Sequence, residues 1–275
     1  MSNSAVRALS GTGFVIIMLF CLLFSKFTFA VLVMLITVGM MVEFYRMTMG
    51  DSYVISRILA IVAAVSLFVL IFCRSAFGMD LKFIALAMAP IFLIMINSLY
   101  VKDKSEFGRF SNIYTALLYI AAPMALSNLI VFQHGRFSRV LLICFFIIIW
   151  ASDIGAYTFG IALGKRFPKK LFESISPKKT WIGYWGGLIM AVVAACILFY
   201  TGYMKYPLIH CIVLAVVMHI AGVWGDLFES QWKRFYNVKD SGNIIPGHGG
   251  LLDRFDSTLM AMPIGAVYLA IFNLL

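Results

Sequence analysis

Charged residues are scarce in this chain of 275 residues: Asp, Glu, Lys and Arg together make up 12% of it. That is about half of their share in a typical soluble domain. Hydrophobic residues supply 63%, and the mean hydropathy is +0.97. A soluble domain of this length could not hide so much apolar surface in one core, so the remainder must face lipid. The composition excludes an ordinary soluble protein and predicts a chain that crosses a membrane several times.

CxxC pairs are absent from the sequence, and acidic residues are few. The five cysteines stand singly within apolar stretches and form no CxxC pair. We therefore interpret them as core or lipid-facing residues rather than as metal ligands or disulfide partners. Lys and Arg outnumber Asp and Glu by 22 to 12, which gives a net charge of +10. Anionic lipid headgroups attract such basic loops, so the charge requires no nucleic-acid partner.

Long apolar runs dominate what is present, and runs of about 17–25 residues predict membrane helices. They lie near residues 11–25, 27–44, 57–73, 83–100, 112–132, 138–162, 183–201, 207–230 and 258–274. We expect an all-α polytopic membrane protein with about nine transmembrane helices. Arg7 followed by an apolar run could be misread as a signal peptide. No polar mature domain follows it, which favours retention of this run as the first membrane helix.

Basic residues predict the orientation of the chain. If the N-terminus lies inside, the N-terminal tail and the even-numbered loops hold 16 of the 22 Lys and Arg residues, and the odd-numbered loops hold six. The positive-inside rule then favours a cytoplasmic N-terminus. It also places residues 164–182 and 233–257 in the cytoplasm.

The two halves of the chain differ in their polar residues. Residues 1–137 contain almost no ionisable residue within the apolar runs apart from Glu43, near a helix end, and we expect scaffold helices without a motif. Residues 138–275 place Asp153, Asp226 and Glu229 inside apolar runs. A charged group at mid-membrane costs at least ~2.5–3.5 kcal/mol, so such residues usually face a cavity, a partner or an ion. The second half is therefore the predicted catalytic region.

The apolar run near 207–230 ends in a polar stripe. Asp226, Glu229, Ser230 and Lys233 have i, i+3, i+4, i+7 spacing, which places them on one face of a helix. A buried ion pair or a polar contact between helices would explain this stripe without a catalytic role. The stripe alone does not decide between these interpretations.

A glycine-rich stretch follows, and it indicates an anion-binding loop. Glycines 242, 247, 249 and 250 allow the backbone to turn tightly and to bring its N–H groups against an anion. Lys239 and Arg254 would add positive charge for phosphates. His248 could donate a hydrogen bond to a phosphate. A solvated turn at the membrane surface is the alternative interpretation.

Carboxylates next to this loop predict a divalent cation. Asp253, Asp256 and Ser257 take i, i+3, i+4 positions at the expected start of the last helix, and Asp226 offers a third carboxylate. Magnesium is typically bound by one or two carboxylates plus phosphate oxygens. Upstream, Asp153 shares a helix face with Gly160 and Gly164, which is also typical of close helix packing.

The stretch from Ser176 to Trp181 is predicted to open a helix. Pro177 would set the first helical turn, and the neighbouring hydroxyls and lysines suit a phosphate at a helix N-terminus. Lysines beside a cytoplasmic membrane face are also expected without any ligand. This motif is therefore weak when taken alone.

Together these stretches resemble the motifs of phosphatidate cytidylyltransferases, also called CDP-diacylglycerol synthases, in their bacterial form. In chain order they are Asp153-x-x-Ala156-Tyr157, Gly164-Lys165, Ser176-Pro177-x-Lys179-Thr180-Trp181, Gly225-Asp226-Leu227, Ser230-Gln231-Trp232-Lys233-Arg234, Lys239-Asp240 and the run from Pro246 to Asp256. The match covers the C-terminal half; the N-terminal half agrees only in hydropathy and in the number of spans. Ile182 replaces an expected polar residue, which argues against a substrate contact there.

The resemblance implies a reaction and its residues. A cytidylyl group would pass from CTP to phosphatidic acid, giving CDP-diacylglycerol and pyrophosphate, with Mg²⁺ and a second cation such as K⁺. Asp226 and Asp253 are the implied metal ligands, with Asp256 as a third. The implied catalytic residues are Asp226, Asp253, Lys239, Arg254 and His248. The implied substrate-binding residues are Asp153, Lys165, Ser176, Lys179, Thr180, Ser230, Lys233, Arg234, Asp240, Gly247, Gly249 and Gly250.

The expected setting is the bacterial inner (cytoplasmic) membrane, with the active site facing the cytoplasm. The expected partners are CTP, phosphatidic acid and membrane lipids, and a homodimer is the assembly that we consider. Two alternatives differ in class. One is a related CTP-dependent lipid kinase, or a cytidylyltransferase for another lipid phosphate. The other is an ion-coupled transporter, although transporters typically show repeats and helix breaks at the membrane midplane.

Overall fold

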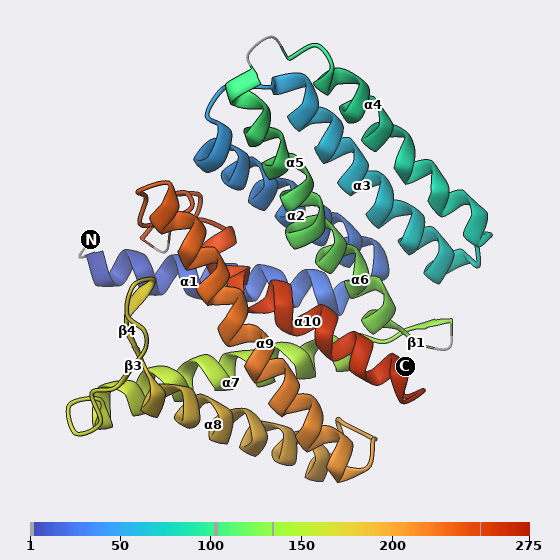
Figure 1. Ribbon diagram of the computed structural model, residues 1–275. Helices are drawn as coiled ribbons and strands as arrows, with labels where there is room; N and C mark the ends of the chain where they lie inside the picture. Colours follow the sequence, from blue (N-terminus) through green and yellow to red (C-terminus); the bar gives the residue numbers. More distant parts are fainter. Residues whose placement is uncertain (1–2, 102–103, 134, 248) are drawn as a thin grey trace. The chain divides into compact units, whose positions relative to one another are not determined.

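The structure is a computed structural model that describes residues 3–101, 104–133, 135–247 and 249–275. Helices dominate these residues (Figure 1). Seven helical segments among them are long and apolar enough to cross a membrane, and Leu9–Phe24 forms a shorter apolar helix. The expectation of an all-α polytopic membrane protein is confirmed. The count of nine spans and the cytoplasmic N-terminus stay predictions.

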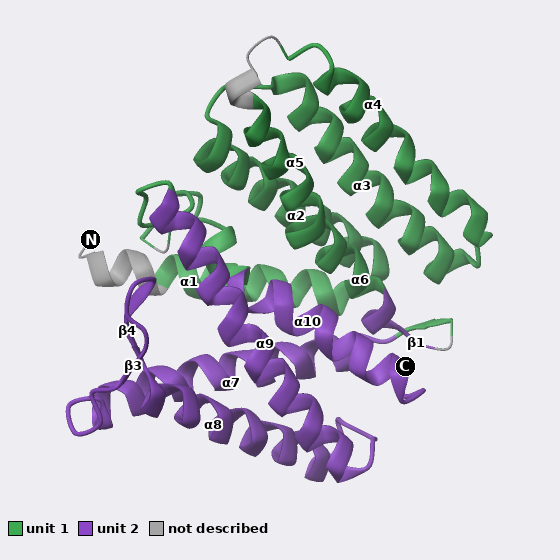
Figure 2. Cartoon of the chain, in the orientation of Figure 1, with its two compact units in different colours: residues 1–128, 135–137, 236–255 green, residues 129–134, 138–235, 256–275 purple. Residues whose placement is uncertain are grey.

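The chain divides into two compact units, shown in Figure 2. Unit 1 comprises residues 1–128, 135–137 and 236–255, and unit 2 comprises residues 129–134, 138–235 and 256–275. The segment 236–255, which carries the glycine-rich stretch, thus packs with the N-terminal helices. The division of function expected after residue 137 stays a prediction.

Unit 1 is built from apolar helices around an aromatic and methionine core. Its elements are α1 (Asn3–Phe24), α2 (Lys26–Met49), α3 (Val54–Phe77), η1 (Leu81–Ala87), α4 (Met88–Ser98), η2 (Lys104–Phe110), α5 (Ser111–Ala116), η3 (Leu117–Ala121) and most of α6 (Ala122–Val131). Ser25 begins α2 with a capping box. In the core, Phe29 contacts Phe68 with ring centroids 6.3 Å apart, and the Tyr45 hydroxyl donates to the Ile113 carbonyl at 3.3 Å.

Unit 2 is built around two closely packed helices. It contains the short strand β1 (Phe132–Gln133), whereas β2 (Arg136–Phe137) belongs to unit 1. Its main elements are α7 (Val140–Leu163), β3 (Lys170–Phe172), β4 (Ser176–Thr180), α8 (Trp181–Tyr200), α9 (Leu208–Phe235) and α10 (Leu252–Ile271), which begins in unit 1. Helices α7 and α8 lie side by side (Figure 1). A Cβ atom on Gly155 would lie 2.7 Å from the Gly186 carbonyl oxygen, so glycine is what permits this approach.

The predicted helix start at Ser176 is wrong. Residues 176–180 form β4, which pairs antiparallel with β3, with Lys170 opposite Thr180 and Phe172 opposite Ser176. Helix α8 begins only at Trp181, where the Thr180 hydroxyl accepts a hydrogen bond from the Gly183 N–H at 3.2 Å. The capping hydroxyl therefore sets the helix start. Pro177 is tolerated because both strands of a two-stranded sheet are edge strands, where a residue without a backbone N–H can face outward.

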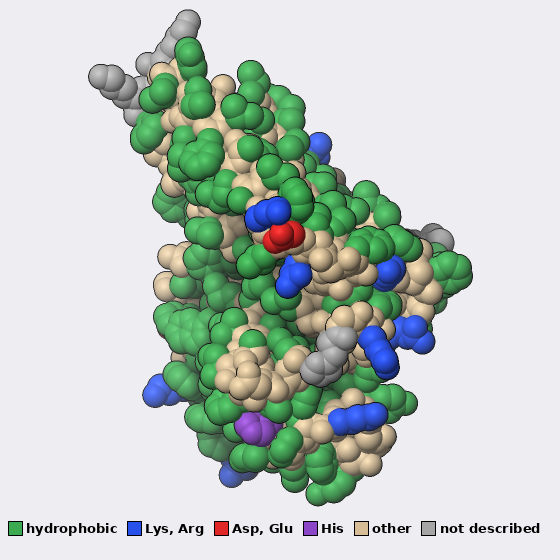
Figure 3. Space-filling model, turned by 90° about the vertical axis from the view of Figure 1, so that its right-hand side faces the viewer, with side chains coloured by type: hydrophobic (Ala, Val, Ile, Leu, Met, Phe, Trp, Pro, Cys, Tyr) green, Lys and Arg blue, Asp and Glu red, His purple; other side chains and the backbone are tan. Residues whose placement is uncertain are grey.

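Large apolar side chains cover much of the surface, as expected of a chain that faces lipid. Hydrophobic side chains dominate the face drawn in Figure 3, with scattered Lys and Arg among them. Leu99, Leu118 and Ile161 are 81%, 75% and 62% exposed. Exposed apolar side chains in such number are unusual for a soluble protein. The composition and the exposed surface therefore agree on a membrane environment.

Candidate active site

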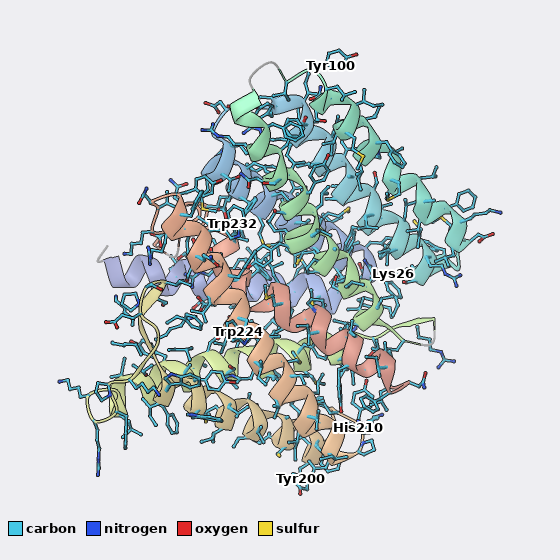
Figure 4. The ribbon with its side chains drawn as sticks, viewed as in Figure 1. Lys26, Tyr100, Tyr200, His210, Trp224 and Trp232 are labelled. Carbon is cyan, nitrogen blue, oxygen red and sulfur yellow. The ribbon has the colours of Figure 1, made fainter. Side chains whose placement is uncertain are left out.

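Four acidic side chains come within electrostatic reach of one another in unit 2. Helix α9 contributes Asp226 and Glu229, α7 contributes Asp153, and α10 contributes Asp256. Trp224 and Trp232, which flank the α9 acids in the sequence, lie on the half of α9 remote from His210 (Figure 4). The i, i+3 spacing predicted from the sequence therefore does place two acids near one end of this helix. We call Asp153, Asp226, Glu229 and Asp256 the acid cluster.

Small residues allow the helices of the acid cluster to meet. A Cβ atom on Gly225 would lie 2.5 Å from the Asp256 carbonyl oxygen, so α9 and α10 touch backbone to backbone beside Asp226. One turn earlier, Gly222 faces Ser257. Larger residues here would separate the carboxylates of the two helices. The glycines of α9 thus serve the geometry of the acids.

Among the described residues, Lys179 forms an ion pair with Asp226. It reaches the acid cluster from β4, and its ammonium group contacts Asp226 Oδ2. Ser230, one turn along α9, donates to Asp226 Oδ1 at 3.3 Å. Both partners of the ion pair keep more than a quarter of their side-chain surface exposed, at 27% for Lys179 and 30% for Asp226. The pair is therefore accessible to a ligand from solution.

Glu229 and Lys233 form a second, buried ion pair on α9. Lys233 Nζ lies 2.5 Å from Glu229 Oε2, and the side chains are 11% and 1% exposed. A charge buried to this degree needs its partner, because isolated burial is very costly. The buried ion pair that we considered as an alternative for this stripe is thus present. It involves Glu229 and Lys233, whereas Asp226 and Ser230 contact each other.

Asp256 is the carboxylate of the acid cluster on α10. Burial, followed by the negative charges of Asp226, Glu229 and Asp153, raises the pKa of its carboxyl well above the ordinary value. The Ser257 N–H donates to its Oδ1 at 2.6 Å, which opposes the shift. Carboxylates that repel one another in a partly buried place are typical of functional sites.

The chemistry of the acid cluster fits a hard divalent cation. Four acids face the two lysines of the ion pairs, so negative charge is in excess among these six residues. Among the described residues, no three His, Cys, Asp or Glu side chains already stand as a complete metal-binding group. Magnesium does not require one, since one or two carboxylates plus phosphate oxygens and water satisfy it. Asp226 and Asp256 supply such a pair.

Asp253 has a different environment, in unit 1. Its Oδ2 accepts hydrogen bonds from the Gly250 N–H at 2.8 Å, the Ser241 N–H at 2.9 Å and the Ser241 hydroxyl at 3.0 Å. These bonds close the glycine loop, which we define as residues 242–250, onto the start of α10. Asp253 and Asp256 share the first turns of that helix, as predicted. A metal role for Asp253 stays a prediction.

The glycine loop has the conformation that its sequence predicts. Gly247 and Gly249 have φ angles of +75° and +84°, a region that side chains strongly disfavour. The Ile245 N–H donates to the Gly249 carbonyl at 3.0 Å, which closes a tight turn. Gly250 is buried. His248, the predicted phosphate donor, lies outside the described residues, and its role stays a prediction.

The other predicted binding residues lie on three exposed segments. Lys165 follows α7, Ser176 lies in β4, and Arg234 at the end of α9 donates through Nε to the Ile175 carbonyl at 3.3 Å. In unit 1, Lys239, Asp240 and Arg254 flank the glycine loop with exposed side chains. Thr180 is the α8 cap, so its hydroxyl is already engaged. Contacts of these residues with a substrate stay predictions.

Glu43 is the residue that sequence reasoning undervalued. It lies in α2, is 3% exposed, and its Oε2 accepts hydrogen bonds from the Leu252 N–H at 3.0 Å and the Ser241 hydroxyl at 3.3 Å. It therefore contacts both ends of the glycine loop. The signal was its isolation: it is the one acid in the run 27–44, and a buried lone acid usually has a partner elsewhere.

Comparisons with known proteins show which family the chain resembles. The profile of the cytidylyltransferase family matches residues 5–272. The chain is 33% identical to the phosphatidate cytidylyltransferase of Bacillus subtilis over 278 residues, which cover 99% of this chain and 100% of the relative. It is 35% identical to the Rickettsia bellii phosphatidate cytidylyltransferase over 184 residues, 64% of this chain and 78% of that one. The Staphylococcus aureus phosphatidate cytidylyltransferase is 43% identical over 121 residues, 43% of this chain and 45% of that one.

Proposed function

The chain belongs to the cytidylyltransferase family, and from this we infer that it is a phosphatidate cytidylyltransferase, an integral membrane enzyme that joins CTP to phosphatidate and releases pyrophosphate. The observation that carries the inference is the identity to the Bacillus subtilis enzyme over 99% of the chain. The acid cluster with its accessible Lys179 adds a physical reason, because two polyanions must be brought together there.

The reaction needs positioning more than it needs a base. A phosphate oxygen of phosphatidate attacks the α-phosphorus of CTP; a new P–O bond forms there while the bond to the β-phosphate oxygen breaks. A phosphomonoester with a second pKa near 6 is largely ionised at pH 7, so the nucleophile is ready without a strong general base. Within unit 2, Lys179 would hold phosphate oxygens. Phosphate binding by Gly247, Gly249 and Gly250 of unit 1 is what the resemblance implies.

The acid cluster would hold the divalent cation. Asp226 and Asp256 are the pair best suited to it, and their lone pairs fit Mg²⁺ together with phosphate oxygens. When bound, such an ion neutralises the phosphates and favours in-line displacement. Asp253 is the further ligand that the resemblance implies. Its Oδ2 already accepts three hydrogen bonds, so a metal would have to share this carboxylate with the loop. A second cation such as K⁺ stays a prediction.

The proposed orientation in the membrane rests on the distribution of Lys and Arg along the chain. We place the protein in the bacterial inner membrane with the acid cluster and the glycine loop on the cytoplasmic side, where CTP is made. The excess of Lys and Arg in residues 164–182 and 233–257 supports this side. A homodimer stays a prediction.

Labelled CTP distinguishes the proposed reaction from its alternatives. Purified protein in detergent receives phosphatidate, Mg²⁺ and CTP labelled on either the α- or the γ-phosphate. A cytidylyltransferase moves the α-label into lipid and the γ-label into pyrophosphate. A lipid kinase moves the γ-label into lipid instead, and a transporter moves neither. Label from α-labelled CTP in a lipid that co-migrates with CDP-diacylglycerol is the expected result.

The same assay tests the metal and the lipid. EDTA should abolish transfer, and added Mg²⁺ should restore it. Replacing phosphatidate with a polyprenyl phosphate tests a cytidylyltransferase of different lipid specificity. Transfer to the polyprenyl phosphate with none to phosphatidate would overturn the assignment of the substrate, and full activity in EDTA would remove the metal from the proposal.

A further inference from the structure

One carboxylate of the N-terminal half, that of Glu43, accepts hydrogen bonds from the segment 241–252, which contains part of the family motif. Glu43 projects from α2 into unit 1, where it is 3% exposed. Its Oε2 accepts the Leu252 N–H and the Ser241 hydroxyl. These partners stand 209 and 198 residues away in the chain. A buried carboxylate is costly unless hydrogen bonds satisfy it, and these two partners satisfy Oε2.

The partners of Glu43 explain what it fixes. Leu252 is the first residue of α10, and its N–H has no acceptor within the helix. A carboxylate is the preferred acceptor at this end, because the helix dipole favours negative charge there. Glu43 therefore acts as a cap supplied by another helix. It fixes the residue at which α10 begins, and hence the direction in which Asp253 and Arg254 leave the helix.

Ser241 links Glu43 to the other carboxylate of the loop. Its hydroxyl lies 3.3 Å from Glu43 Oε2 and 3.0 Å from Asp253 Oδ2, and its N–H also donates to Asp253. The two carboxylates thus share the one hydroxyl proton of Ser241, directly before the glycine loop. Asp253 lies on the loop's own segment, whereas Glu43 anchors it to α2.

The neighbouring glycines are shaped around this carboxylate. A Cβ atom on Gly242 would lie 2.4 Å from Glu43 Oε1, and one on Gly250 would lie 2.5 Å from Glu43 Oε2. One turn earlier on α2, a Cβ on Gly39 would collide with the Leu251 side chain. Two of the loop glycines therefore make room for Glu43. A side chain at any of these three glycines would require Glu43 or Leu251 to move.

We propose that Glu43 is a positioning residue, which anchors the glycine loop and the first turn of α10 to α2 in the geometry that binds substrate phosphates. The phosphate part rests on the proposed function. The anchoring part does not, and it can be measured without substrate. If the acid merely filled space, an apolar residue of similar size would serve as well.

The test compares local opening with activity. In a cysteine-free background, Ile245→Cys reports on the glycine loop, because Ile245 is 7% exposed, and Met204→Cys, 2% exposed, reports on unit 2. Each is combined with Glu43→Leu, with Glu43→Gln, or with the control Thr48→Val. Thr48 is also buried on α2, but its hydroxyl bonds to Phe44 of the same helix. Iodoacetamide labelling is followed in detergent, and transfer from CTP to phosphatidate is measured alongside.

We expect Glu43→Leu to lower kcat/KM about ten- to a hundredfold, as for the loss of a hydrogen bond to a charged group. Labelling at position 245 should quicken by about tenfold, with position 204 still protected. Glu43→Gln keeps an acceptor oxygen but loses the charge that strengthens both bonds, so its labelling should quicken by about threefold. Thr48→Val should stay within about twofold of the parent.

Three results would overturn the proposal: activity of Glu43→Leu within about twofold of the parent, lost activity with position 245 still protected, or equal deprotection of positions 245 and 204. Where Glu43→Leu gives no folded protein, the labelling of Glu43→Gln decides between the same outcomes. A parent that transfers nothing from CTP to phosphatidate would instead refute the proposed function, while the labelling comparison would still test the anchor.

Discussion

Asp226 shows how one residue joins several elements of the enzyme. It lies on α9, forms an ion pair with Lys179 of β4, accepts from Ser230, and acts electrostatically on Asp256 of α10. Its two oxygens are thus directed by partners on both sides. A residue that is oriented in this way and still 30% exposed is suited to bind an ion from solution. Asp153, on α7, senses the same charges of Asp226 and Lys179.

Asp226→Asn should therefore abolish most activity without unfolding the protein. The amide keeps the shape and can still accept from Ser230, but it loses the charge that a divalent cation requires. We expect kcat/KM to fall by on the order of a hundredfold or more. Asp80→Asn is the matched control, because Asp80 is an exposed acid that pairs with Lys82. Near-parental turnover of Asp226→Asn at saturating Mg²⁺ would exclude Asp226 from the proposed metal site.

Lys179 makes a second prediction at the scale of one residue. Lys179→Met removes the ammonium group from beside Asp226 and should lower kcat/KM by about ten- to a hundredfold through lost phosphate binding. Lys178→Met changes the exposed neighbour on the same strand by the same chemistry and should leave activity within about threefold. Steady-state rates over a range of CTP concentrations measure both variants. Equal losses of activity in the two variants would mean that only the total positive charge of β4 affects the rate.

The position of Asp153 in the acid cluster depends on the packing of α7 against α8. Ser152 of α7 and His219 of α9 share a hydrogen bond of 2.7 Å deep in unit 2, and glycines at the α7–α8 contact let these helices approach. Gly187 adjoins both residues: a Cβ there would lie 2.9 Å from His219 and 2.9 Å from the Ser152 carbonyl. The position of Asp153 is set by this packing, since it follows Ser152 directly.

Gly155→Ala tests the contact of these helices. Its Cβ would lie 2.7 Å from the Gly186 carbonyl oxygen, and a backbone atom cannot yield as a flexible side chain can. Overpacking of this kind costs about 1–3 kcal/mol, so the variant should unfold at lower temperature in detergent. Gly13→Ala in α1 is the control, because nothing lies within 4 Å of its Cβ. If both variants melt like the parent, α7 and α8 do not need glycine to pack.

The sequence predicted the helices better than their connections. Each long apolar run became a helix, because lipid requires the backbone to satisfy its hydrogen bonds within the segment. Residues 176–180 were predicted wrongly as a helix start, because Pro177 is typical of one. The strand that they form depends on pairing with β3, which the local sequence does not indicate. Glu43 was recognised as unusual, but its partners 198 and 209 residues away leave no local trace. Local periodicity predicts elements, and only folding reveals which distant polar groups meet.

Charge and apolar surface set the behaviour of the whole molecule in a membrane. The apolar surface determines that it inserts, and the basic loops determine which way. The segments 164–182 and 233–257 carry the predicted phosphate ligands, and we expect both on the cytoplasmic side. Lys170 and Asn243 are exposed representatives of the two segments, and Tyr203 is exposed in the connection between α8 and α9.

The orientation is testable with single cysteines at these three places in a cysteine-free background. Because the positive-inside rule puts both basic segments in the cytoplasm, Lys170→Cys and Asn243→Cys should resist an impermeant maleimide added to intact cells. Tyr203→Cys, in an odd-numbered loop, should react. After permeabilisation all three should be labelled, which shows that the protected thiols are accessible once the reagent enters. Labelling of position 170 or 243 from outside intact cells would contradict the orientation, and it would separate the phosphate ligands from the compartment that supplies CTP.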